Sequence, residues 1–140
     1  MDAEGRDLLK VWTDDLPWLG QYVLDERGNP VPAAGLLQWG EWMQTANRQV
    51  ALTEFPWGCV STVFLGLDCN FDPVPMREPL HYQPVLWETM IFVKPAYTEN
   101  AVLKDLDMEQ RRYRSREGAL EGHREMVERV KRQGVGNREQ

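Results

Sequence analysis

Four short segments in which apolar residues alternate with polar ones, or run together, predict the strands of one antiparallel sheet. They are residues 50–55, 59–67, 85–93 and 111–114. The second and third are rich in β-branched and aromatic residues, which is typical of strands. Segment 59–67 is apolar at both alternating sets of positions, so we expect it to be packed on each face. The last segment is short and charged, which suits an edge strand.

Two segments have apolar residues at helical spacing. The first, residues 35–45, places four apolar side chains on one face: Leu36, Trp39, Trp42 and Met43. The second begins after Ser115, a good N-cap residue. Its stripe comprises Ala119, Leu120, His123, Met126, Val127 and Val130. The fold class that these patterns predict is α+β. We expect an antiparallel sheet of about three to five strands, with the C-terminal amphipathic helix packed on one face and the shorter helix from the N-terminal half elsewhere.

The length of 140 residues predicts one domain, which we place at residues 1–134, with a flexible C-terminal tail at 135–140. A further strand is expected at 21–25, before a turn at 26–30 that contains Gly and Pro. Residues 68–84 carry four prolines, which preclude a regular helix or a central strand. Loops of this length are usually functional or disordered.

Composition narrows the class of protein. Apolar residues make up 42% and charged residues 27%, as in an ordinary globular domain. The net charge of −6 argues against general nucleic-acid binding, which needs clustered Lys and Arg. No apolar segment approaches the length of a membrane span, and the N-terminal residues lack the apolar core of a signal peptide. Together with two cysteines that we expect to be reduced, Cys59 and Cys69, this predicts a cytoplasmic protein.

Glu88 stands inside the apolar segment WETMIF. Burying a carboxylate there is costly unless it is paired or protonated. It is therefore either a functional group, as a general base or a ligand anchor, or a structural partner for Arg112 or Arg114 on the neighbouring strand. By alternation it shares a face with Leu86, Met90 and Phe92.

His123 lies on the apolar stripe of the C-terminal helix and is expected to face the sheet. Such a residue is either a core histidine with satisfied hydrogen bonds or half of a functional pair. In the second interpretation its partner across the interface between helix and sheet is Glu88 or Asp68. These three residues are the catalytic candidates, although no complete catalytic constellation is recognisable in the sequence.

Further binding candidates lie where the chain leaves the second strand. Asp68, Cys69 and Asn70 end that strand, and Asp68 with Asn70 also fits an Asx-turn that starts the loop. Asp72 adds an oxygen, but the spacing matches no calcium loop. His81 lies further along the same loop. We expect no metal and no cofactor, because zinc, phosphate-loop and dinucleotide motifs are missing from the sequence.

Trp57 is predicted to stand at the tip of a hairpin, in the turn between the first two strands. An exposed indole there would suit a contact with a partner, because Trp is enriched in interface hot spots. The alternative is a tip that folds back onto the N-terminal segment.

Several sequence motifs resemble those of a group of small bacteriophage and prophage proteins. The chain has STVFLGLD, then NF, then WETMIF and RYRSREGALEGH. Members of the group typically show V-S-T-V-[FW]-L-G-L-D-H-x-F, [LF]-F-E-T-M-[IV]-F and R-Y-x-[ST]-x-x-E-A-x-x-G-H. The likeness covers about residues 21 to 130, and it places Asp68, Glu88 and His123 at polar positions of the motifs. Cys69 departs from it, because relatives usually have His there.

That group has no established activity, so the resemblance implies a viral source without a mechanism. The leading hypothesis is a phage-type accessory protein that acts in the host cytoplasm by binding, without catalysis. Its partner would be a host protein or a small signalling molecule of host defence, and it could form homo-oligomers. One alternative is a small hydrolase or nucleotide-processing enzyme that uses Glu88, Asp68 and His123. The other is a minor virion or assembly protein.

Overall fold

The computed structural model describes residues 20–68 and 83–133, which fall into two compact units. The described parts of the first, here called the N-terminal unit, are residues 20–47, 66–68 and 83–84. Those of the second, the sheet unit, are residues 48–65 and 85–133. A single domain over 1–134 stays a prediction, and the tail at 135–140 lies outside the described residues.

The N-terminal unit is a small hairpin followed by a helix. Its elements are β1 (Tyr22–Leu24), β2 (Pro30–Pro32) and α2 (Leu36–Thr45). The Asp25 carboxylate forms the turn by accepting the N–H groups of Arg27 and Asn29, both at 2.9 Å. The predictions of a strand at 21–25 and a helix at 35–45 are confirmed. The second strand was missed because two of its three residues are prolines, which are normally confined to sheet edges.

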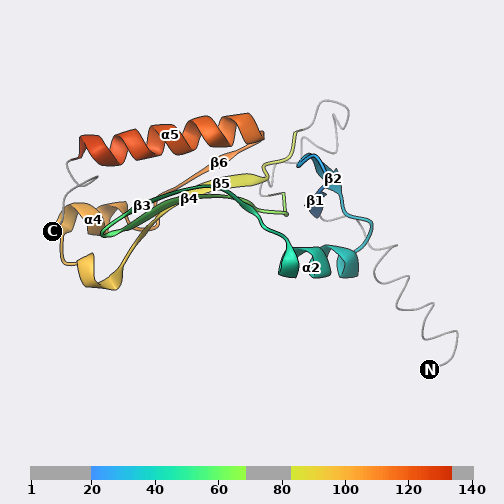
Figure 1. Cartoon of the computed structure of the whole chain (residues 1–140), viewed down its shortest axis with the longest axis horizontal. Coiled ribbons are helices and arrows are strands. Elements are labelled where there is room, and N and C mark those ends of the chain that lie inside the picture. The colour runs from blue at the N-terminus through green and yellow to red at the C-terminus, as the bar shows by residue number, and fades with distance from the viewer. Residues whose placement is uncertain (1–19, 69–82, 134–140) are drawn as a thin grey trace, which may run out of the picture. The chain divides into compact units, whose positions relative to one another are not determined.

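The sheet unit contains four antiparallel strands and a long C-terminal helix. Its elements are β3 (Gln49–Phe55), β4 (Gly58–Phe64), β5 (Trp87–Val93), η1 (Pro95–Tyr97), α4 (Ala101–Leu106), β6 (Gln110–Tyr113) and α5 (Arg116–Arg132). The strand order is β3-β4-β5-β6, and α5 lies along one face of the sheet (Figure 1). The predicted α+β class, antiparallel sheet, C-terminal helix and shorter second helix are all observed.

The hydrophobic core lies between the sheet and the helices α4 and α5. Its buried members are Phe55, Trp57, Val60, Ile91, Leu103, Leu106, Met126, Val127 and Val130. Along β4, buried residues alternate with half-buried ones, so the expected packing on both faces of this strand is wrong. The reason is that α5 covers only one face. We call the face toward α5 the covered face and the opposite one the open face.

Local chemistry explains how α5 begins and how closely it approaches the sheet. The Ser115 hydroxyl accepts the N–H of Gly118 at 3.0 Å, which confirms the predicted N-cap. A Cβ atom at Gly122 would overlap the phenol ring of Tyr113 on β6, so a glycine is needed where helix and strand meet. Leu120 was predicted on the buried stripe but is exposed. Among the described residues, no helix is long and apolar enough to cross a membrane.

Candidate functional site

Glu88 and His123 lie on opposite faces of the sheet, so the predicted pairing of these two side chains is wrong. His123 reaches the covered face, where its imidazole contacts Thr62 of β4. Thr62 and Thr89 are cross-strand partners on that face. Glu88 precedes Thr89 in β5, and adjacent strand residues point to opposite faces. Glu88 therefore belongs to the open face.

On the open face Glu88 forms an ion pair across the last two strands. Its Oε2 accepts a hydrogen bond from Nε of Arg112 at 2.9 Å, and the two residues are register partners. The Glu88 side chain is only 12% exposed, whereas that of Arg112 is 41% exposed. The interpretation of Glu88 as a structural partner for an arginine on the neighbouring strand is thus confirmed, with Arg112 as that partner. Such a pairing is a charge-assisted hydrogen bond between adjacent strands, and it supports the register of β6 against β5.

His123 is the centre of a chain of hydrogen bonds inside the core. Its Nε2 lies 2.8 Å from the Thr53 hydroxyl, and its Nδ1 lies 2.8 Å from the Thr62 hydroxyl. The Thr62 hydroxyl in turn lies 2.5 Å from that of Thr89. Thr62 and Thr89 are fully buried, and His123 is 8% exposed. The chain of contacts joins α5 to three strands, which confirms the core-histidine interpretation.

The hydrogen bonds around His123 account for its buried position in structural terms. Burial lowers the pKa of the His123 imidazole, which favours the neutral ring with one N–H donor and one acceptor nitrogen. Either tautomer can be satisfied, because each threonine hydroxyl both donates and accepts. The partners on both nitrogens are threonine hydroxyls, which do not ionise in the physiological range. The arrangement therefore satisfies buried polar groups and supplies no carboxylate that would make His123 a stronger base.

Trp57 is fully buried, so its prediction as an exposed contact for a partner is wrong. Its ring stacks on Phe55, with centroids 5.0 Å apart and planes 3° from parallel. Its carbonyl accepts the N–H of Lys94 at 2.7 Å, which ties the hairpin tip to the chain after β5. The turn is short, and the core that α4 and α5 complete extends to that end of the sheet, so the indole is drawn into it.

Asp68 belongs to the N-terminal unit, whereas Glu88 and His123 belong to the sheet unit. Its backbone N–H donates to the carbonyl of Gly20 at 2.8 Å. Burial, and then the charge of Asp68, raises the pKa of the Tyr22 hydroxyl. The remaining predicted binding positions lie outside the described residues: Cys69, Asn70, Asp72 and His81.

The open face carries a cluster of apolar side chains that the sequence analysis did not single out. Leu52 is 47% exposed and Phe92 is 44% exposed. By strand register they adjoin half-buried Met90 and Cys59, with Ser61 at the centre. We call these residues the apolar patch: Leu52, Cys59, Ser61, Met90 and Phe92. Glu54 stands beside Cys59, and burial together with the Glu54 charge raises the pKa of that thiol.

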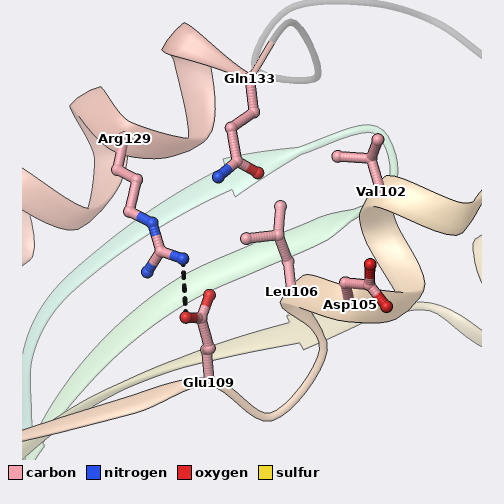
Figure 2. Close-up of a pocket in the computed structure, with 6 residues that line it drawn as sticks. All are labelled: Val102, Asp105, Leu106, Glu109, Arg129 and Gln133. Carbon is pink, nitrogen blue, oxygen red and sulfur yellow. Dashed lines mark ion pairs between the residues drawn. The ribbon is translucent and has the colours of Figure 1, made fainter.

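A pocket of ≈ 400 Å³ lies at the far end of α5, beside α4 and the turn that leads into β6 (Figure 2). Its lining combines two apolar side chains with four polar ones: Val102, Leu106, Asp105, Glu109, Arg129 and Gln133. Oε1 of Glu109 lies 2.7 Å from Nη2 of Arg129. In residues 20–68 and 83–133, no three His, Cys, Asp or Glu side chains gather so that they could hold a metal ion.

Sequence reasoning missed these two surfaces for different reasons. Phe92 lies on the same face of β5 as Glu88, because an even number of residues separates the two along the strand. Once Glu88 is interpreted as the ion-pair partner of an arginine on an open face, this alternation predicts that Phe92 is exposed. The residues of the pocket come from segments with no common motif, and their meeting depends on how α4 and α5 end.

Known protein families, curated proteins and solved structures include none that matches this chain.

Proposed function

We propose that this chain is a small phage-type accessory protein that acts in the host cytoplasm by binding a host protein, without catalysis. The viral source rests on the motif resemblance given above. The mode of action rests on one observation, the exposure of Leu52 and Phe92 on the open face. Large apolar side chains that are exposed together typically mark surfaces for protein contacts.

The apolar patch has the anatomy of a small interface core. Side chains from three adjacent strands contribute to it, so a rigid sheet holds them in place. Polar groups border it, with exposed Glu54 at one end and the ion pair of Glu88 with Arg112 at the other. An apolar centre within a polar rim is the usual arrangement at a protein–protein interface.

Charge indicates what kind of partner would fit. The chain carries a net charge of −6, and one of its negative groups, Glu54, lies at the border of the patch. A second copy of the chain would bring like charges together, whereas a basic protein surface would be attracted. The proposed partner is therefore a host protein with an apolar spot inside a basic rim.

Capture from a cytoplasmic lysate of bacterial hosts, followed by direct binding measurements with each purified protein identified, tests this proposal. The test variants are Leu52→Ser and Phe92→Ser. The matched control is Leu120→Ser, which changes an exposed apolar residue on α5. We expect both test variants to lose about tenfold or more in affinity for the same protein, and the control to keep wild-type affinity.

Three results would contradict the proposal. One is a partner whose binding is unchanged by both open-face variants. Another is self-association in sedimentation that Leu52→Ser or Phe92→Ser abolishes, which would make the patch a homodimer interface. The third is turnover of a nucleotide that His123→Ala abolishes in a folded protein, which would support the enzyme alternative.

A further inference from the structure

The strand β3 forms one edge of the four-stranded sheet, and its register determines which backbone groups point outward. Among the described strands, β3 pairs with β4 alone. Phe64 donates its N–H to the carbonyl of Arg48 at 2.9 Å, so the even-numbered residues of β4 bond to β3. Their register partners in β3 are Ala51, Thr53 and Phe55. Because successive residues of a strand direct their N–H and C=O groups to opposite sides, those of Leu52 and Glu54 point away from β4.

The two edges of this sheet differ in how well they resist further pairing. β6 is four residues long and two of them are arginines, and such charge discourages the addition of another strand. β3 is seven residues long, and one of them is charged, Glu54. Its register shifts before Ala51, so the regular edge runs over residues 51–55. β3 is therefore the edge suited to accept a further strand, which is a common way to bind an extended peptide.

The side chains at this edge indicate what the added strand carries. Leu52 and Glu54 lie on the open face, where Leu52 is 47% exposed and Glu54 is exposed as well. Cross-strand pairs of two apolar residues or of two opposite charges are favourable. An antiparallel strand beside β3 thus suits an apolar residue opposite Leu52 and, two positions before it, a basic residue opposite Glu54. A basic residue also fits a chain whose net charge is −6.

We propose that β3 takes up an extended segment of the partner protein as a further antiparallel strand, with a basic residue on Glu54 and an apolar residue on Leu52. This inference rests on the proposed function, because it names the segment by which the same host protein reaches the apolar patch. In the complex, Leu52 and Glu54 exchange backbone hydrogen bonds with the residues opposite them. These bonds supply affinity, and the two side-chain positions supply specificity.

Titration of the full chain with the blocked pentapeptide threonine-arginine-threonine-valine-threonine, followed by backbone amide shifts in NMR, tests the proposal. We expect saturable shifts at residues 51–55, with roughly millimolar affinity for so short a segment. Methylation of the arginine and valine amide nitrogens removes the donors that face β3 and should abolish the shifts. Glutamate in place of the arginine should weaken binding by about threefold or more. Absence of binding, equal binding of the methylated peptide, or equal shifts along β6 would overturn the proposal.

Matched proline variants test the backbone contact by itself. Glu54→Pro removes an outward N–H from β3, and proline is tolerated where that group faces solvent. We expect it to weaken peptide binding by about tenfold or more, and by more than Glu54→Gln, which keeps the N–H. Gln110→Pro is the control on the other edge and should leave affinity unchanged: Glu109 bonds to Ile91 of β5, so the N–H of Gln110, the next residue, points outward.

Hydrogen exchange in the unsubstituted chain gives the answer if Glu54→Pro does not fold. Without peptide, the amides of Leu52 and Glu54 should exchange faster than that of Thr53, which bonds to β4. With peptide bound, both should slow markedly. Exchange at Leu52 and Glu54 that the bound peptide leaves unchanged would overturn the proposal.

The host protein identified by capture separates this inference from the proposed function. Binding that is lost in Leu52→Ser and Phe92→Ser but kept in folded Glu54→Pro would retain the proposed function and overturn the added strand. Binding that survives both serine variants would contradict the proposed function itself, and the added strand with it. Loss of binding in all three variants, with Gln110→Pro unaffected, is the result that we expect.

Discussion

The two faces of the four-stranded sheet are built from alternate residues of the same strands, yet they have opposite physical characters. On the covered face, Thr62 and Thr89 are fully buried, and the Thr62 hydroxyl is hydrogen-bonded to both Thr89 and His123. One residue away, on the open face, Glu88 pairs with an exposed Arg112. A polar residue in a strand therefore takes its role from the layer packed against it, because α5 excludes water from one face of this unit only.

The largest expected difference between the faces is in side-chain packing. Ile91 is fully buried, whereas Phe92, its neighbour in β5, is exposed over 44% of its surface. We expect Ile91→Ala to lower the free energy of unfolding by about 2–5 kcal/mol, and Phe92→Ala to lower it by less than about 1 kcal/mol. Urea unfolding followed by circular dichroism measures both. Equal losses would mean that the open face is packed in solution.

Removing a buried hydroxyl tests the polar part of the covered face. Thr62→Val keeps the shape of the side chain but leaves Nδ1 of His123 and the Thr89 hydroxyl without their shared partner. We expect a loss of about 1–3 kcal/mol in the free energy of unfolding. Ser61→Ala removes a hydroxyl from the open face, where water can replace its hydrogen bond with the Gln49 amide, and serves as the control. A neutral Thr62→Val would show that the hydrogen-bond chain contributes nothing to stability.

The buried histidine should make stability depend on pH. Burial lowers the pKa of folded His123, so below about pH 6.5 the unfolded chain takes up a proton that the folded chain does not. The titration of His123 therefore leaves the free energy of unfolding unchanged above that pH. Below it, the free energy of unfolding falls as the pH is lowered toward the pKa of folded His123, by at most about 1.4 kcal/mol per pH unit.

Unfolding curves collected between neutral and mildly acidic pH measure this slope. His123→Gln should flatten it, whereas His81→Gln, which changes the other histidine of the chain, should retain it. The same slope in the wild type and His123→Gln would assign the pH dependence to other groups.

The smallest expected effect is that of the ion pair on the open face. Glu88→Gln keeps the volume and hydrogen-bonding capacity of the side chain, and Arg112 remains hydrated. We expect a loss of about 0.5–1 kcal/mol in the free energy of unfolding, diminishing as salt is added. A loss comparable to that of Ile91→Ala would mean that water is excluded from this pair.

Most of the local structure could be predicted from the sequence. Ser115 marks the start of α5 because its hydroxyl is suited to cap a helix, and the stripe through His123, Met126 and Val130 marks the face that is buried. The strands of the sheet unit follow from alternation and β-branched composition. These signals are local, since capping and periodicity depend on residues within one or two turns or along one strand.

Only the tertiary structure decided which polar residues meet. Alternation along β5 places Glu88 and Thr89 on different faces of the sheet, but it does not say which face α5 covers. Because α5 covers the face of Thr89, His123 is separated from Glu88. The tertiary packing also buries Trp57 in the core and places Glu109 beside Arg129. The physical reason is that burial belongs to the packed layers as a whole. A strand supplies two candidate faces, and the helix that lies on one of them determines what each side chain does.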